Sequence, residues 1–170
     1  MVLTKSELIG ALQHEVHVLV HLAGKVEPQM IDYRPTPQQR STLELLRYMT
    51  VMGPALIEAA RDGGFDPARW NAREEPANAR GFDETVKALA GLQDAYDTLL
   101  GDLSEEDFRR EIEMWGRRTT IGSFVVTMVL NGHAAYRTQL FLYLKSCGRQ
   151  ELGTMNLWAG TDAPAPAATT

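Results

Sequence analysis

Hydrophobic residues recur every three or four positions along most of this chain, the spacing that gathers side chains on one side of an α-helix. Each such run is preceded by residues that favour an N-terminal cap: Thr4, Ser41, Asp83, and Thr119 or Thr120. The first two belong to a Ser/Thr-x-x-Glu capping box, which opens a helix. The pattern predicts four long helices, at about 4–25, 41–63, 83–99 and 120–148.

The segments between these helices are polar and carry prolines. Pro28, Pro35 and Pro37 predict an extended loop over 27–39. Other connections are a polar linker at 65–81, a short helical turn at 104–107 and an extended piece at 110–119. Four long helices with such connections predict an all-α protein, a four-helix bundle with long connections and a short extra helical turn.

The chain has 170 residues, which suits one domain, expected over residues 1–160. Residues 163–170 read APAPAATT and lack apolar bulk, so we expect residues 161–170 to form a disordered tail.

Polar residues on the apolar faces are the strongest functional signal. A helix advances about 100° per residue, which places Glu15 inside the apolar arc of the first helix. In the last helix His133 stands at the centre of the apolar stripe, with Arg137 about 40° away. Tyr48 lies at the margin of the stripe in the second helix. A buried charge needs a partner, so we expect Glu15 to pair with Arg137 or His133.

Two interpretations of these inward-facing groups are open. One is a structural ion pair beside a buried histidine. The other is a ligand-binding or catalytic pocket, because helix bundles build such sites from polar side chains on facing helices. The candidate pocket residues are Glu15, Tyr48, His133, Tyr136 and Arg137.

The first helix also carries His14, His17 and His21 on the face opposite its apolar arc. The sequence HEVH is one residue short of the HExxH zinc motif, and no Glu-x-x-His of a di-iron bundle occurs. We expect this face to lie in solvent or at an oligomer contact, and Cys147 to be an ordinary thiol.

Charge and composition exclude several classes of protein. Lys and Arg number 17 against 22 Asp and Glu, a net charge of -5 that offers no basic footprint for nucleic acid. No apolar run is long enough for a membrane span. One cysteine and an N-terminus unlike a signal peptide predict a cytoplasmic protein.

Two stretches resemble the DinB-like (YfiT-type) superfamily of four-helix bundles. They are Ser41-Thr-Leu-Glu44-Leu-Leu-Arg-Tyr48 in the second helix and His133-Ala-Ala-Tyr136-Arg137-Thr138-Gln139 in the last. The resemblance covers about residues 4–150. It implies a nickel or zinc ion held by three histidines, and in several members a transferase or isomerase activity that uses a low-molecular-weight thiol.

Carried over residue by residue, the three histidine positions fall on Tyr48, Gly132 and Tyr136, none of which is histidine. His133 is displaced by one position, unless a bulge in the helix restores it. We therefore expect no high-affinity metal site at the family position. The remaining metal candidates are His133 and an inward-facing His21, with Glu15.

The leading prediction is thus a DinB-like protein of uncharacterised activity, with a small polar interior pocket for a small-molecule ligand. One alternative is a metal- or thiol-dependent transferase or hydrolase with altered ligands. Another is a non-catalytic homodimeric binding or structural protein. We also expect a homodimer, because the apolar arc of the first helix spans about 200°, more than one core needs. The alternative is that the excess apolar surface is covered by the long proline-rich loop and by residues 152–158 folding back.

Overall fold

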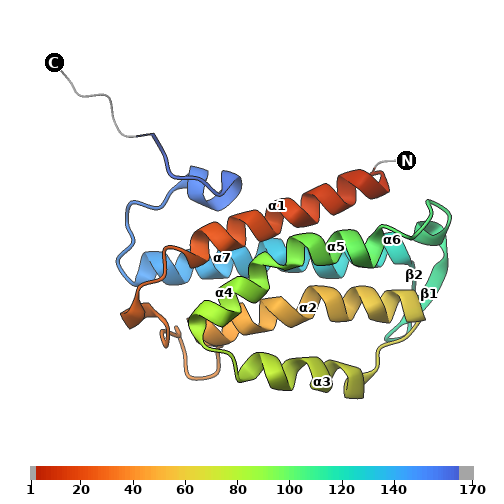
Figure 1. Ribbon diagram of the computed structural model, residues 1–170, viewed down its shortest axis with the longest axis horizontal. Helices are drawn as coiled ribbons and strands as arrows, with labels where there is room; N and C mark the ends of the chain where they lie inside the picture. Colours follow the sequence, from red (N-terminus) through yellow and green to blue (C-terminus); the bar gives the residue numbers. More distant parts are fainter. Residues whose placement is uncertain (1–2, 165–170) are drawn as a thin grey trace.

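The computed structural model describes residues 3–164 and shows a bundle of four helical columns (Figure 1). The first two columns are single helices, α1 (Lys5–Ala23) and α2 (Thr42–Asp62). The third is divided into α4 (Phe82–Ala90) and α5 (Leu92–Leu100). The fourth is one continuous helix with three parts: α6 (Ile121–Phe124), a π-helical stretch (Val125–Leu130) and α7 (Asn131–Ser146). The predicted all-α four-helix bundle is confirmed.

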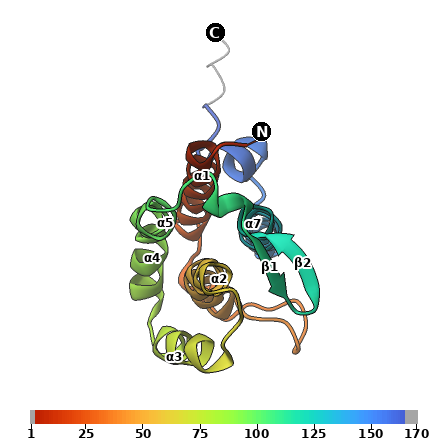
Figure 2. The same ribbon diagram turned by 90° about the vertical axis from the view of Figure 1, so that its right-hand side faces the viewer.

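The columns surround one core of leucine, methionine and valine side chains. In the view along the bundle, α1, α2, α7 and the α4–α5 pair occupy the four corners (Figure 2). Leu12 and Leu19 of α1, Leu46 and Met49 of α2 and Leu140 of α7 are fully buried between them. Burial of these side chains is the main favourable contribution to the stability of the bundle.

Both predicted capping boxes open their helices. The backbone N–H of Glu7 donates to Thr4 Oγ1 at 3.2 Å, and the Thr4 N–H donates to Glu7 Oε2 at 2.8 Å. Ser41 and Glu44 repeat the arrangement at α2. At the fourth column, Thr120 accepts from the N–H of Ser123 at 3.2 Å. These side chains satisfy backbone donors that the first helical turn leaves unpaired.

The predicted polar linker at 65–81 is wrong, because it contains a helix, α3 (Pro67–Asn78), that packs on α2 (Figure 2). The segment contains two prolines, Pro67 and Pro76, and proline can interrupt an α-helix. Pro67 instead occupies the first helical turn, where its missing N–H costs nothing, and the N–H of Ala68 donates to Asp66 Oδ1 at 2.9 Å. Pro76 lies within the last turn.

The predicted third helix is also corrected in detail. It begins at Phe82 after Gly81 rather than at an Asp83 cap, and the N–H of Gly81 donates to Glu84 Oε2 at 2.9 Å. It is divided in two at Gly91, which ends α4 and precedes α5.

The extended piece predicted at 110–119 is a β-hairpin of β1 (Glu111–Met114) and β2 (Arg117–Thr120). Its strands are antiparallel, with Met114 opposite Arg117. The predicted turn at 104–107 is a short 3₁₀ helix (Asp107–Arg109), and another (Pro28–Met30) lies in the proline-rich loop. The hairpin lies beside the fourth column (Figure 2).

Beyond α7 the chain folds back over α1, where Met155–Ala159 forms a short π-helical turn (Figure 1). The segment returns along the side of α1 that carries His14 and His21, and Leu152 is buried in the core. Asp162, within the predicted tail, accepts from Lys25 Nζ at 2.6 Å. The remainder of that predicted tail, residues 165–170, lies outside the described residues.

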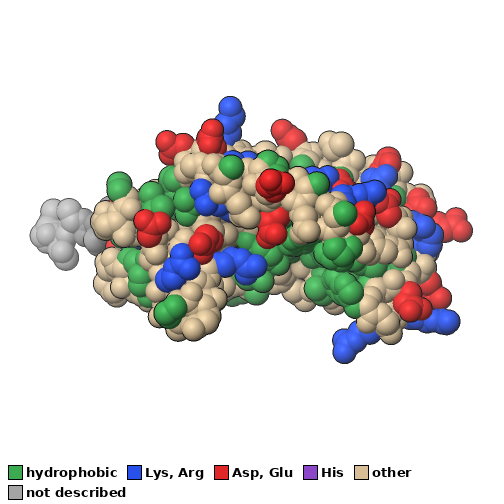
Figure 3. Space-filling view, turned by 90° about the horizontal axis from the view of Figure 1, so that it is seen from below, with side chains coloured by type: hydrophobic (Ala, Val, Ile, Leu, Met, Phe, Trp, Pro, Cys, Tyr) green, Lys and Arg blue, Asp and Glu red, His purple; other side chains and the backbone are tan. Residues whose placement is uncertain are grey.

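No helix within residues 3–164 has both the length and the apolar character needed to cross a bilayer. Seen from below, charged side chains are scattered over the surface, with hydrophobic side chains gathered between them near the middle (Figure 3).

Candidate functional site

Glu15 and Arg137 form a buried ion pair between α1 and α7, as predicted. Arg137 Nε lies 3.3 Å from Glu15 Oε2, and the two side chains are 3% and 11% exposed. Burial raises the pKa of Glu15 and outweighs the opposing effect of the Arg137 charge. Neither of these two atoms has a hydrogen-bond partner of good geometry in the described chain. The two side chains therefore attract each other electrostatically, but Glu15 Oε2 and Arg137 Nε do not form a hydrogen bond of good geometry.

The C-terminal segment closes over this pair. The guanidinium carbon of Arg137 lies 4.9 Å from the centre of the Trp158 ring, a cation–π contact. His14 Nε2 lies 2.7 Å from the backbone oxygen of Trp158. The fold-back thus excludes water from the outer side of Arg137.

His133 does not pair with Glu15 but contacts the Tyr96 hydroxyl through Nε2. Both side chains are completely buried between α7 and α5. Burial lowers the pKa of His133 to about 3 and raises the pKa of the Tyr96 hydroxyl. Both groups are therefore neutral at pH 7 and share one hydrogen bond between the Tyr96 hydroxyl and His133 Nε2.

Tyr96 is not among the site residues that the sequence predicted. The available signal was its hydroxyl, because a buried tyrosine generally needs a hydrogen-bond partner. Gly53 of α2 was missed as well. A Cβ there would lie 2.0 Å from Tyr96 Oη and 3.2 Å from His133 Nε2, so only glycine leaves room for this contact.

Tyr48 and Tyr136 face a groove of about 290 Å³ between α2 and α7. Their ring centres lie 5.1 Å apart in an edge-to-face arrangement. Tyr48 also lies 6.0 Å from the Trp70 ring, and the Arg40 guanidinium stacks 3.9 Å above it. Burial, followed by the neighbouring Tyr136, raises the pKa of Tyr48, so its hydroxyl is neutral and can donate.

The structure does not bring the five candidate residues into one pocket. Tyr48 and Tyr136 line the groove, whereas Glu15, His133 and Arg137 do not. Arg137 contacts α1, and His133 contacts α5. The physical reason is the 100° step of the helix, which directs neighbouring residues of α7 toward three different columns.

The three residues at the family's metal positions, Tyr48, Gly132 and Tyr136, all line this groove. Met52 lies across it, with Sδ and Cε at 3.2 and 3.1 Å from the point where Gly132 would carry a Cβ. Two neutral tyrosines and a thioether are a poor ligand set for nickel or zinc, which prefer imidazole and thiolate. The residues present do not fit the metal that the resemblance implies.

The alternative metal ligands are directed elsewhere. The π-helical stretch Val125–Leu130 is a bulge of the kind that could have shifted His133, yet His133 faces Tyr96. His21 Nε2 lies 3.0 Å from Asn156 Nδ2 on another face of the bundle. Within residues 3–164, no three His, Cys, Asp or Glu side chains are close enough together to hold a metal ion.

The histidine face of α1 is only partly covered by the C-terminal segment, and His14 and His17 remain exposed. His14 contacts Trp158, and His21 contacts Asn156. A Cβ at Gly160 would lie 2.7 Å from His17 Cδ2. The expected solvent exposure is therefore confirmed for His14 and His17, whereas His21 is half-buried beside the returning segment.

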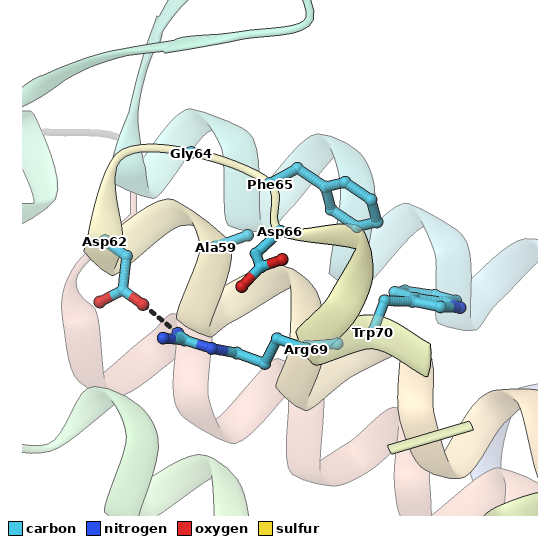
Figure 4. A pocket seen from close by; sticks show the side chains of 8 residues that line it. Ala59, Asp62, Gly64, Phe65, Asp66, Arg69 and Trp70 are labelled. Atoms are coloured by element: carbon cyan, nitrogen blue, oxygen red, sulfur yellow. Dashed lines mark hydrogen bonds and ion pairs between the residues drawn. The ribbon is translucent and has the colours of Figure 1, made fainter. Parts of the chain in front are cut away.

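A smaller hollow of about 110 Å³ lies where α2 turns into α3 (Figure 4). Asp62 and Arg69 form an ion pair on one side of it, and the rings of Phe65 and Trp70 lie toward the other. Its size admits a few water molecules but no sizeable ligand.

Comparisons with known proteins place the fold. No protein-family model matches the sequence, and no curated protein sequence matches it. Among solved structures, the chain is similar to the crystal structure of a DinB-like protein, YjoA, from Bacillus subtilis, with a TM-score of 0.61 and 20% sequence identity. The match covers 86% of this chain and 94% of that one. The chain therefore has the fold of the DinB-like proteins.

Proposed function

We propose that this DinB-like protein binds a small organic molecule in the groove between α2 and α7, without a metal ion. The observation that carries the proposal is the composition of that groove. The positions at which the resemblance implies metal-binding imidazoles carry Tyr48, Gly132 and Tyr136, and an open groove of about 290 Å³ remains beside them.

The groove offers a particular chemistry. Met52, Leu56 and Met128 supply apolar walls, and methionine side chains adapt to ligands of irregular shape. The neutral hydroxyl of Tyr48 is a hydrogen-bond donor. Arg40 stacks on the Tyr48 ring and places a positive charge beside it. This combination favours a ligand with an aromatic or apolar body and a hydrogen-bond-accepting group.

The buried polar groups contribute a different function. Glu15–Arg137 and Tyr96–His133 join α7 to α1 and α5, respectively. Their contacts fix the rotation of α7, and this rotation directs Tyr136 toward α2. We propose that these four residues are structural and that the groove is the binding site.

The test has two parts. Protein purified without a histidine tag is analysed for nickel and zinc, and benzoate and phenol are titrated while tryptophan fluorescence is recorded. Trp70 lies 6.0 Å from Tyr48 and reports on the groove. We expect substoichiometric metal and tighter binding of benzoate than of phenol. Tyr48→Phe should weaken benzoate binding about fivefold, the value of one hydrogen bond.

Tyr33→Phe is the matched control, because Tyr33 packs on Tyr143 away from the groove. It should bind benzoate as the unmodified protein does. Near-stoichiometric nickel or zinc would instead favour the metal- or thiol-dependent enzyme. Equal binding by the Tyr48→Phe and unmodified proteins would reject the groove as the site.

A further inference from the structure

We infer that the ligand is an elongated amphipathic anion, whose apolar body lies along the fourth column and whose anionic group is held by Arg117 and Arg118 of the hairpin. This inference rests on the proposed function and names the ligand class of the same groove. It depends on a second groove, on the helix that joins the two, and on the residues at the far end.

The two grooves are neighbours that share two lining residues. A second hollow of about 440 Å³ lies between the hairpin and the fourth column, and Trp115, Arg117, Arg118 and Phe124 contribute to its lining. Thr127 and Met128 line both this hollow and the α2–α7 groove. Ligand pockets span roughly 300–1,000 Å³, so the first groove alone is just below that range, and the second lies within it.

The shared residues lie in the π-helical stretch Val125–Leu130. A π-helical turn adds one residue to the turn, and such turns often occur at functional sites. The Thr127 hydroxyl donates to the Ser123 carbonyl at 2.8 Å, which leaves its methyl group as the available surface. Met128 is 38% exposed. The surface between the two grooves is therefore apolar, and the flexible Met128 side chain can adjust to the apolar body of a ligand.

Trp115 forms an aromatic rim at the far end. It is 57% exposed, and its ring lies 5.7 Å from the rings of both Phe65 and Phe124. Its φ is 52° and that of Gly116 is 75°, so the hairpin turn requires two residues with positive φ. Asparagine suits the first position far better than a bulky aromatic residue. The chain thus keeps a strained tryptophan where an unstrained residue would serve the turn.

Arg117 and Arg118 contribute two positive charges to the far end, where Glu113 lies opposite Arg118 in the hairpin register. Within residues 3–164 neither guanidinium forms an ion pair, although the whole chain carries a net charge of -5. Guanidinium groups bind carboxylates and phosphates through paired hydrogen bonds. The helix from Ser123 to Tyr136 spans about 20 Å at 1.5 Å per residue. The arrangement fits a chain-like apolar body with a carboxylate or phosphate at its hairpin end.

The experiment compares four probes by fluorescence and calorimetry on the full chain: dodecanoate below its micelle concentration, hexanoate, dodecanol and dodecyltrimethylammonium. We expect dodecanoate to bind at least tenfold more tightly than each of the others. Anionic phospholipid vesicles form a fifth arm, and binding to vesicles without binding to monomeric dodecanoate would overturn the inference.

Two variants locate the ends of the ligand. Arg117→Gln/Arg118→Gln should weaken dodecanoate binding at least tenfold and leave benzoate binding unchanged. Trp115→Asn creates an Asn-Gly turn, which preserves the hairpin, and should weaken dodecanoate binding through loss of the aromatic rim. Arg109→Gln, an exposed arginine outside both grooves, is the control and should bind like the unmodified protein.

The two proposals can fail separately. If benzoate binds and depends on Tyr48, but dodecanoate binds no more tightly than hexanoate, the ligand class is rejected while the groove remains the site. If the Arg117→Gln/Arg118→Gln variant binds dodecanoate as tightly as the unmodified protein, the ligand class is also rejected. If neither benzoate nor dodecanoate binds, the proposed function itself is wrong.

Discussion

At the scale of single residues, Gly53 makes the buried Tyr96–His133 contact possible. A Cβ at this position would lie 2.0 Å from Tyr96 Oη and 3.0 Å from Cζ. We expect Gly53→Ala to reduce the free energy of unfolding by about 2 kcal/mol, because overpacking of a filled core typically costs about 1–3 kcal/mol. Urea denaturation of the purified variant measures the change.

Tyr96→Phe provides the matched test of that cause. It deletes the oxygen that the new methyl group would meet, so Gly53→Ala should cost distinctly less in the Tyr96→Phe background. An equal cost in both backgrounds would show that the glycine serves another purpose.

The second prediction concerns the pH dependence of His133. Burial lowers its pKa to about 3 in the folded protein, whereas a histidine in an unfolded chain titrates near 6.5. Between these values the unfolded chain binds a proton that the folded chain does not. The free energy of unfolding should therefore be unaffected above about pH 6.5 and should fall below it by up to about 1.4 kcal/mol per pH unit.

Comparison with His133→Gln isolates this contribution. Glutamine offers an acceptor to Tyr96 but does not titrate. Because both proteins share the same carboxylates, the difference between their stability curves from pH 7.5 to 5 belongs to the histidine. Parallel curves would contradict the assignment of His133 as a neutral buried base.

At the scale of elements, the Glu15–Arg137 pair joins α1 to α7. We expect Glu15→Gln to lower the free energy of unfolding by about 3 kcal/mol, the low end of the cost of breaking a buried pair, because Arg137 keeps the Trp158 ring as a partner. The double variant Glu15→Leu/Arg137→Met should be close to neutral, since it leaves no unpaired charge. A double variant less stable than Glu15→Gln would assign the pair a net stabilising contribution.

The C-terminal segment is the other contact between elements. Asn156 anchors it by donating to His21 Nε2 at 3.0 Å and to Asp162 Oδ1 at 2.9 Å. Burial, followed by the charge of Lys25, lowers the pKa of His21. The Asp162 carboxylate of the segment opposes this shift without reversing it, so the docked state favours neutral His21. Docking is at full strength above the unfolded pKa of about 6.5 and weakens as the pH falls through the lowered folded value.

We expect limited proteolysis within residues 153–162 to accelerate as the pH falls from 7.5 to 5.5. Asn156→Ala should show fast cleavage at both pH values, because its anchor is absent. Met155→Ala is the control, since Met155 is 43% exposed and should change little. Cleavage rates that do not depend on pH would exclude His21 as the titrating group.

At the scale of the whole molecule, a homodimer remains a prediction. The C-terminal segment covers part of the histidine face of α1 but leaves His14 and His17 exposed. Exposed apolar side chains remain elsewhere, including Leu142 and Trp158 at 55% and 61% exposure. We expect light scattering at micromolar concentration to give about twice the chain mass of 18.9 kDa. A mass near 18.9 kDa would reject the dimer.

Local signals in the sequence determined the helical class, the start of three helices, the extended character of residues 110–119 and the inward orientation of Glu15, His133 and Arg137. Caps and turns depend on residues within about four positions of one another, and an apolar arc depends only on helical periodicity. The same local reasoning failed at Pro67, because proline is compatible with the first turn of a helix as well as with a loop.

Only the tertiary structure decided which columns these residues meet. The sequence gives the direction of a side chain around its own helix, but the identity of the facing helix depends on how the columns pack. Glu15 therefore had two candidate partners, Tyr96 and Gly53 went unrecognised, and one expected pocket became a groove and two buried contacts. The return of residues 155–162 across α1 joins positions more than a hundred residues apart, and no local pattern encodes such a contact.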